Sequence, residues 1–164
     1  MRSVLVTLLF LLALPASAAL DPNLAPFEPY LNKTWRGEFS DSTPEKPVVD
    51  ISTWEPALQG KAIRIRHSLN QGAYEGETFV VWNKEREQLE FFYFTSAGFY
   101  TRGTATFEGR RFVAYETVTG SDEGITEVRS EVSLNEDGTM SQQAYYLKQG
   151  EWVPGHSALY REVK

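Results

Sequence analysis

Residues 62–83 read AIRIRHSLNQGAYEGETFVVWN, and this stretch decides the fold class. In its first eight residues the apolar Ile63 and Ile65 alternate with the charged Arg64 and Arg66. A period of two is the pattern of a β-strand with one face toward a core. The triplet Asn-Gln-Gly then provides a turn, and a second run rich in Thr, Phe and Val follows it. The stretch therefore predicts two antiparallel strands joined by a tight turn.

The same unit recurs along the chain. Short β-rich runs follow one another, and most of the turns between them contain Gly, which permits the positive φ of tight hairpins. No run has a sustained helical period, so the chain is predicted to be all-β. The ten expected strands are residues 33–39, 48–54, 62–69, 77–83, 89–95, 99–107, 112–119, 126–134, 140–148 and 152–162.

Ten antiparallel strands in chain order leave two open edges unless the sheet closes on itself. Closure removes those edges, so we expect a single antiparallel up-and-down barrel, with a flattened sandwich as the alternative. An eight-stranded barrel is nearly filled by its own side chains or holds one small ligand, and ten strands enclose more space. The strand count therefore predicts a cavity.

The N-terminal segment predicts export. Met1-Arg2-Ser3 is a positively charged start, residues 4–14 are apolar except for one Thr, and Pro15 precedes the small-residue motif Ala16-Ser17-Ala18. This apolar run of 11 residues is too short for a membrane span, which needs roughly 20. We expect cleavage after Ala18 or one residue later, and a periplasmic or secreted product.

Three segments follow from these patterns. We expect residues 1–18 to be a signal peptide, residues 19–29 to be a Pro-containing lead-in, and residues 30–164 to be the barrel domain.

Composition excludes several classes of function. Without residues 1–18 the chain has 15 basic and 22 acidic residues, a formal charge of −7. An acidic chain with no basic cluster is a poor partner for nucleic acids and anionic membranes. Cysteine is absent, which excludes disulfides, thiol catalysis and thiolate metal sites.

The first expected strand carries a family resemblance. Residues 31–39, LNKTWRGEF, resemble the opening strand of the calycin barrels, the lipocalins and fatty-acid-binding proteins, which begin with a Gly-x-Trp element. The nearer match is nitrobindin, whose first strand typically reads GTWRGEG; here Lys33 and Phe39 replace the outer glycines. The segments GFYT, 98–101, and EWVPGH, 151–156, are similar to an exported bacterial barrel family of unknown function.

The resemblance implies three structural or functional roles. In calycin barrels the Trp of this element plugs one end, which implies the same role for Trp35. An arginine of the last strand covers that Trp in lipocalins, which implies a cation–π contact for Arg161, with a surface position as the alternative. Nitrobindin binds haem through a histidine near its C-terminus, which His156 matches in position, and a single axial histidine is chemically sufficient. The competing interpretation is a loop histidine with no ligand, and our first expectation includes no cofactor and no metal.

Polar residues on apolar strand faces are candidates for ligand binding. His67 shares a face with Ile65, so it is either a buried histidine satisfied by one hydrogen bond or a polar group projecting into a cavity. Glu116 shares a face with Phe112 and Ala114, where a carboxyl would have a raised pKa and would hold a ligand's polar end or act as a base.

Aromatic residues and one arginine complete the candidate set. Phe91 and Tyr93 alternate along one strand, and they either pack across the sheet or line a cavity. Arg102 alternates with polar residues, which is typical of a solvated face. The functional interpretation of Arg102 is a clamp on a ligand carboxylate, as in fatty-acid-binding proteins.

No enzyme motif is present: the sequence contains no phosphate-binding glycine loop, no G-x-S-x-G and no H-E-x-x-H. The leading hypothesis is an exported protein that binds a small hydrophobic or amphipathic molecule. The alternatives are a nitrobindin-like haem protein and a small isomerase or lyase that uses an interior Glu and His. A further hypothesis is that an outer patch at Phe92 and Phe94 binds a partner or forms a homodimer.

Overall fold

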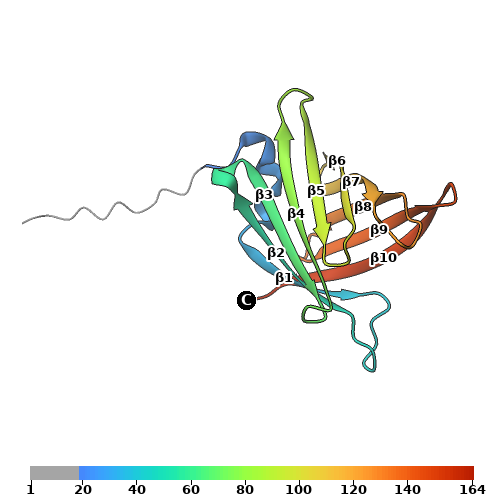
Figure 1. Ribbon diagram of the computed structural model, residues 1–164. Helices are drawn as coiled ribbons and strands as arrows, with labels where there is room; N and C mark the ends of the chain where they lie inside the picture. Colours follow the sequence, from blue (N-terminus) through green and yellow to red (C-terminus); the bar gives the residue numbers. More distant parts are fainter. Residues whose placement is uncertain (1–18) are drawn as a thin grey trace, which may run out of the picture.

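The computed structural model describes residues 19–164, and the expected signal peptide, residues 1–18, lies outside the described residues. Ten antiparallel strands close into one barrel, in which every strand pairs with its neighbours in the chain and β1 pairs with β10 (Figure 1). This confirms the all-β class and the up-and-down barrel. The strands are β1 (Lys33–Phe39), β2 (Val49–Ala57), β3 (Ala62–Leu69), β4 (Tyr74–Asn83), β5 (Gln88–Thr95), β6 (Tyr100–Glu108), β7 (Arg111–Thr119), β8 (Glu127–Leu134), β9 (Met140–Lys148) and β10 (Glu151–Glu162).

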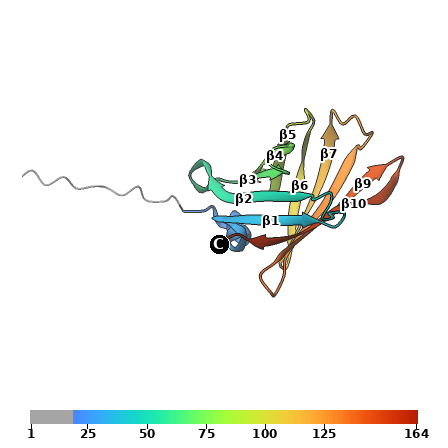
Figure 2. The ribbon, with the colours of Figure 1, turned by 90° about the horizontal axis from the view of Figure 1, so that it is seen from below.

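Closure joins the two ends of the domain. β1 and β10 pair from Trp35 opposite Glu162 to Phe39 opposite Ala158. The C-terminus consequently lies beside the start of β1, where the Val163 N–H donates to the Thr34 carbonyl at 2.8 Å (Figure 2).

The alternation expected for residues 62–69 is confirmed in β3, where Ile63 is fully buried and Arg66 is exposed. β4 starts at Tyr74, three residues before its expected start, because Tyr74 pairs with Leu69 and extends the ladder to the turn.

The expected lead-in forms part of the core. Residues Pro22–Tyr30 form a 3₁₀ helix, η1, which enters one end of the barrel. A 3₁₀ helix has three residues per turn, so Leu24, Phe27 and Tyr30, spaced by three, lie on one side of it. All three are buried, at 0%, 0% and 2% exposure. η1 thus lies in the core, and together with the aromatic side chains around it forms what we call the plug of the barrel. The boundary expected between a lead-in and a barrel domain stays a prediction. A second, short 3₁₀ helix, η2 (Leu58–Gly60), connects β2 to β3.

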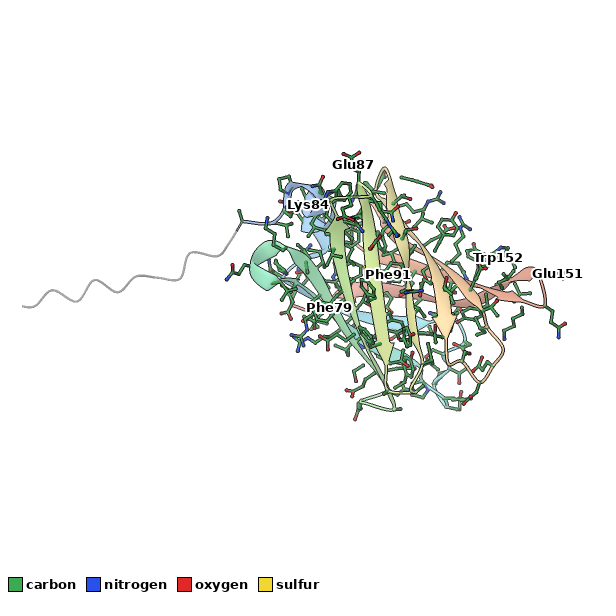
Figure 3. The ribbon with its side chains drawn as sticks, turned by 45° about the horizontal axis from the view of Figure 1, so that its top comes forward. Phe79, Lys84, Glu87, Phe91, Glu151 and Trp152 are labelled. Atoms are coloured by element: carbon green, nitrogen blue, oxygen red, sulfur yellow. The ribbon has the colours of Figure 1, made fainter. Side chains whose placement is uncertain are left out.

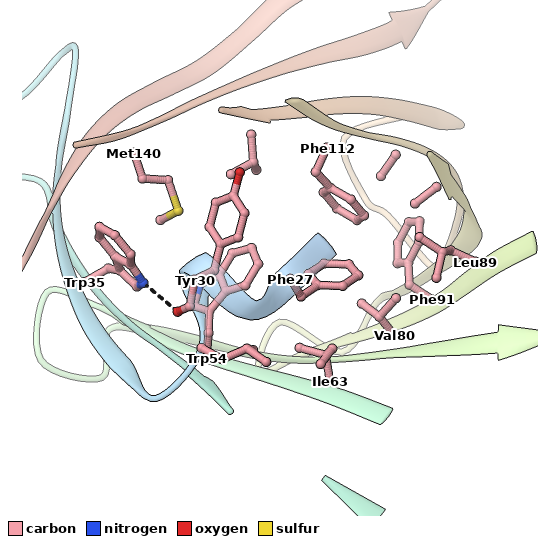
Figure 4. Packing of buried hydrophobic residues seen from close by; sticks show 14 of the residues in the cluster. Phe27, Tyr30, Trp35, Trp54, Ile63, Val80, Leu89, Phe91, Phe112 and Met140 are labelled. Atoms are coloured by element: carbon pink, nitrogen blue, oxygen red, sulfur yellow. Dashed lines mark hydrogen bonds between the residues drawn. The ribbon is translucent and has the colours of Figure 1, made fainter. Parts of the chain in front are cut away.

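Aromatic side chains fill this closed end (Figure 4). Trp35 is fully buried and its indole N–H donates to the Tyr30 carbonyl at 3.2 Å. The Tyr30 ring stacks on Trp54 with centroids 5.2 Å apart. Its hydroxyl donates to the carbonyl of Arg110, in the turn between β6 and β7. Trp35 thus lies in the plug, as the resemblance implied.

The cation over Trp35 is Lys33, not Arg161. The Lys33 Nζ lies 5.3 Å from the centre of the Trp35 ring. Tyr160 takes the inward position of β10, so the next residue, Arg161, points outward and is exposed. Arg161 lies opposite Arg36 in the β1–β10 register. The expectation that Arg161 covers the plug is therefore wrong.

The opposite end of the barrel is open. The turns β1–β2, β3–β4, β5–β6, β7–β8 and β9–β10 lie at this end. The tip of the β9–β10 hairpin, with Glu151 and Trp152, extends beyond the wall, whereas Lys84 and Glu87 mark the β4–β5 turn at the closed end (Figure 3). Within residues 19–164 no helix has the length and apolarity needed to cross a bilayer.

The outer wall carries an aromatic patch. Phe92 and Phe94 of β5 are 39% and 51% exposed, and Phe94 stacks on Tyr100 of β6 with centroids 6.3 Å apart. A partner or second copy at this patch stays a prediction.

Candidate functional site

The barrel encloses a cavity of about 570 Å³ between the plug and the open end. This volume lies in the usual range for small-molecule sites, roughly 300–1,000 Å³. Trp54, Phe112 and Met140 form its floor above η1, and Ala97, Phe99, residues 120–123 and Ile125 line its mouth. Most of the wall is aliphatic or aromatic, and the polar groups on it belong to a few defined clusters.

The first cluster is a chain of hydrogen bonds, which we call the Asp50 chain. The Asp50 carboxylate contacts His67 Nδ1 at 2.9 Å and accepts from the Tyr160 hydroxyl at 3.0 Å. The other ring nitrogen of His67 lies 2.8 Å from the Tyr93 hydroxyl, which lies 2.7 Å from the Tyr74 hydroxyl. Five side chains from five strands are thereby joined across one wall of the cavity.

Two glycines on the inward face make this chain sterically possible. His67 and Tyr93 belong to strands on either side of β4 and meet over Gly76, where a Cβ would overlap both the Tyr93 ring and His67 Nε2. Tyr160 reaches Asp50 across β1 in the same way, because its ring lies directly over Gly37.

Burial fixes the protonation state of the tyrosines. It is the main cause that raises the pKa of Tyr93, and the neighbouring Tyr74 raises it further. Burial and then the Asp50 carboxylate raise the pKa of Tyr160. Both phenols therefore keep their protons at neutral pH and act as hydrogen-bond donors. The Tyr74 hydroxyl ends the chain at the cavity wall, where it is available to a bound molecule.

The second cluster surrounds Glu116 of β7. Its carboxylate accepts from the Thr101 hydroxyl of β6 and the Ser130 hydroxyl of β8, each at 2.7 Å. Burial raises the pKa of Glu116, and the two hydroxyl hydrogen bonds partly oppose that shift. The side chain points inward, so its remaining accessible surface faces the cavity.

The two clusters adjoin along the wall of the cavity. The Asp50 chain reaches Tyr93 of β5, and the Glu116 cluster begins at Thr101 of the neighbouring strand β6. Tyr93 and Thr101 lie opposite each other in the β5–β6 register. A molecule in the cavity therefore meets tyrosine hydroxyls and a carboxyl group on adjoining parts of the wall.

His156 lies at the mouth of the cavity within β10, beside a register shift between Pro154 and Ser157. It belongs to a strand and not to a loop. Its ring stacks on Phe39 with centroids 5.2 Å apart, and its Nδ1 is hydrogen-bonded to the Tyr146 hydroxyl. Part of the ring is exposed to solvent, yet desolvation by these neighbours lowers the pKa of His156, with His67 as the next cause.

The cavity offers one histidine that could ligate haem iron but no partners for the rest of the haem group. With Nδ1 held by Tyr146, the Nε2 of His156 is the atom that would serve as an axial ligand. Haem also carries two propionates, and among residues 19–164 no Lys or Arg lines the cavity to pair with them. The acidic groups Asp50, Glu116, Asp122 and Glu123 line it instead. These residues therefore do not fit haem held inside the barrel. Within residues 19–164 no three His, Asp or Glu side chains are placed to hold a metal ion.

Four of the five expected ligand-binding residues line the cavity: His67, Glu116, Tyr93 and Phe91. That they bind a ligand stays a prediction. Arg102 does not line it, which corrects the expectation of a carboxylate clamp. The neighbours of Arg102 in β6, Thr101 and Gly103, take the inward positions, so Arg102 is exposed opposite Phe92 on the outer wall.

Sequence reasoning missed Asp50, Tyr74 and Tyr160 as members of the site. A signal for Asp50 was present, because Asp50 alternates with Ser52 and Trp54 and so shares the face of a large apolar residue. Nothing in the sequence indicated its partner Tyr160, which lies 110 residues away along the chain.

Comparison with known proteins identifies the fold alone. No family model matches the chain, and no curated protein matches it. A solved structure, the crystal structure of Rv2717c from M. tuberculosis, is similar with a TM-score of 0.65. The match covers 89% of this chain and 100% of that chain at 12% sequence identity. The two proteins therefore share a barrel architecture, and an identity this low says nothing about a shared ligand.

Proposed function

We propose that this protein is an exported binding protein that holds a small hydrophobic or amphipathic molecule in its barrel. The observation that carries the proposal is the cavity of about 570 Å³ with apolar walls and two inward-facing polar clusters. Export rests on the signal-peptide pattern of residues 1–18.

The cavity is maintained by small residues at inward positions. Protein interiors are normally close-packed, with few voids larger than a water molecule. Here Ala114 and Ser130 lie opposite each other at mid-barrel and line the cavity, where larger side chains would fill part of it. A bound molecule would restore the packing contacts that the empty space lacks.

The polar clusters supply orientation. Apolar pockets with a few fixed polar groups are the usual form of a small-molecule site. The Tyr74 hydroxyl and the Glu116 carboxyl are held in place by hydrogen bonds to Tyr93, Thr101 and Ser130. Such groups anchor the polar end of an amphipathic molecule at little entropic cost.

Acid–base catalysis on the bound molecule, by an isomerase or lyase, is the second candidate. The contact of Asp50 with His67 favours it, because a carboxylate at Nδ1 orients a catalytic histidine in many enzymes. Both ring nitrogens of His67 are already hydrogen-bonded, however, so neither is free for a substrate. Binding is therefore the better supported function.

Titration with the neutral dye Nile red tests the proposal. We expect saturable binding with one dye per barrel, and native mass spectrometry of protein from its own export compartment should show a co-purified small molecule. Ala114→Phe places a ring in the cavity and should weaken dye binding by about tenfold or more, a loss of roughly 1.4 kcal/mol.

Thr104→Phe is the matched control, because Thr104 is exposed on the outer face of β6 and the added ring stays outside the barrel. Its dye affinity should equal that of the wild type. Equal loss in both variants, or no binding by the wild type and no co-purified molecule, would contradict the proposed function.

A further inference from the structure

We infer that the molecule bound in the cavity carries a positive charge: an amphipathic amine or quaternary ammonium compound, with Glu116 as its counter-ion. The inference rests on the proposed function and adds the charge of the ligand to it. Three features of the described residues carry it: the charges that line the cavity, the partners of Glu116 and the rings around it.

The lining is acidic. Asp50 and Glu116 lie inside the cavity and Asp122 and Glu123 lie at its mouth, whereas no Lys or Arg lines it. A bound carboxylate would add a further negative charge and would find no cationic partner, so the cavity disfavours fatty acids and similar anions. A cation would meet attraction both at the mouth and inside.

Glu116 differs from the other half-buried carboxylates of the protein. Glu77 pairs with Arg64, and Glu131 pairs with Arg111. Glu116 has only two hydroxyl donors, which orient its oxygens but bring no positive charge. Buried charges are normally paired, yet no Lys or Arg of residues 19–164 lines the cavity beside this carboxylate. A bound cation would balance its charge.

The carboxylate also has room for a further partner. An ionised carboxylate accepts about four hydrogen bonds, and the protein supplies two of them to Glu116. Its free acceptor sites are therefore available to an ammonium N–H, and its charge is available to a quaternary ammonium group.

Tyrosine rings surround the same space. Burial is the main cause of the raised pKa values of Tyr74, Tyr93 and Tyr146, and the charge of Glu116 adds to the shift in each. The three tyrosines line the cavity together with Glu116, and Tyr93 lies opposite Thr101, which donates to the Glu116 carboxylate. Aromatic faces together with a carboxylate are the chemistry that recognises organic ammonium groups.

The test compares three molecules with one hydrocarbon chain: octyltrimethylammonium, 1-octanol and octanoate, each displacing Nile red at neutral pH. We expect the cation to bind about tenfold more tightly than the alcohol, since a cation–π contact and a carboxylate partner both act on its head group. Octanoate should bind more weakly than the alcohol. Octanoate at or above the cation would overturn the inference.

Glu116→Gln keeps the shape of the side chain and removes its charge. We expect the preference for the cation over 1-octanol to be lost, because the amide forms hydrogen bonds but carries no charge. Glu127→Gln, which removes an exposed carboxylate from the same sheet region, should keep the preference. A preference that survives Glu116→Gln overturns the inference. Failure of the proposed function differs from this, because then neither Nile red nor any of the three molecules binds.

Discussion

The two ends of this barrel are built on opposite principles. At the closed end Leu24, Phe27 and Trp35 are fully buried, and the Trp35 N–H satisfies a carbonyl of η1. At the open end the walls leave a cavity of about 570 Å³, and the Asp50 chain spans five strands beside it. Hydrophobic packing thus holds one end, whereas hydrogen bonds order the other.

The difference separates stability from recognition. A packed aromatic plug stabilises the fold through burial, whose free energy is proportional to the apolar area removed from water. Less apolar area is buried around a cavity, so packing stabilises the fold less there. The buried polar side chains of the cavity wall would add a further cost unless each has a hydrogen-bond partner. Within the described residues no buried side-chain nitrogen or oxygen lacks one. We therefore expect substitutions at the closed end to change stability and substitutions at the open end to change recognition.

Phe27→Ala is the strongest way to break the closed end. Phe27 is fully buried and contacts the rings of Phe107 and Phe112, with centroids 4.9 and 5.2 Å away. Truncating a buried Phe leaves a void, so we expect the free energy of unfolding in urea to fall by about 3–5 kcal/mol.

Phe99→Ala is the matched substitution at the mouth of the cavity, where the ring is half-buried. We expect it to cost about 1 kcal/mol, since less area leaves water on folding. Equal losses in the two variants would show that the two ends contribute alike to stability.

The strand ladder was predictable from the sequence, and the plug was not. A period of two identifies β-strands wherever one face is apolar, as in β3, and turn glycines delimit them. Residues 22–30 contain three prolines and have the composition of a linker, yet a spacing of three buries Leu24, Phe27 and Tyr30. That spacing has meaning only for a 3₁₀ helix, which is uncommon at this length.

The residues of the candidate site were predictable only on strands with one apolar face. Alternation divides a strand into two faces, and the interior is evident only when one face is apolar, as it is for His67 and Glu116. In β6 the residues that alternate with Arg102 are polar, which indicated a solvated face, and Arg102 is exposed there. The carboxylate clamp came only from the analogy with fatty-acid-binding proteins, so nothing in the pattern of β6 supported it. Asp50 finds its partners through closure of the barrel, which brings together residues far apart in the chain.

Asp50→Ala is expected to break the hydrogen-bonded region. The carboxylate is 2% exposed, and its loss leaves the Tyr160 hydroxyl and His67 Nδ1 without a partner. Unpaired buried groups of this kind cost roughly 1–3 kcal/mol each, so we expect a loss of about 2–3 kcal/mol in urea unfolding. Tyr160→Phe removes one hydroxyl and should cost about 1 kcal/mol. A loss below that of Tyr160→Phe would mean that Asp50 does not order the chain.

The smallest expected effect concerns pH. Burial raises the pKa of Glu116 above its ordinary value of 4.5. Between 4.5 and the raised value the folded protein holds a proton that the unfolded chain has lost. The free energy of unfolding therefore falls as pH rises through this window, by at most about 1.4 kcal/mol per pH unit for one group.

Glu116→Gln removes this contribution, because the amide does not titrate. Urea unfolding of wild type and variant across the window should show a flatter pH dependence in Glu116→Gln, whereas Glu127→Gln, at an exposed position, should follow the wild type. A bound organic cation favours the ionised carboxylate and should therefore lower the pKa of Glu116. The pH range over which stability falls should then narrow in the wild type and in Glu127→Gln, but not change in Glu116→Gln. A slope that is the same in all three proteins would show that Glu116 is not buried with a raised pKa.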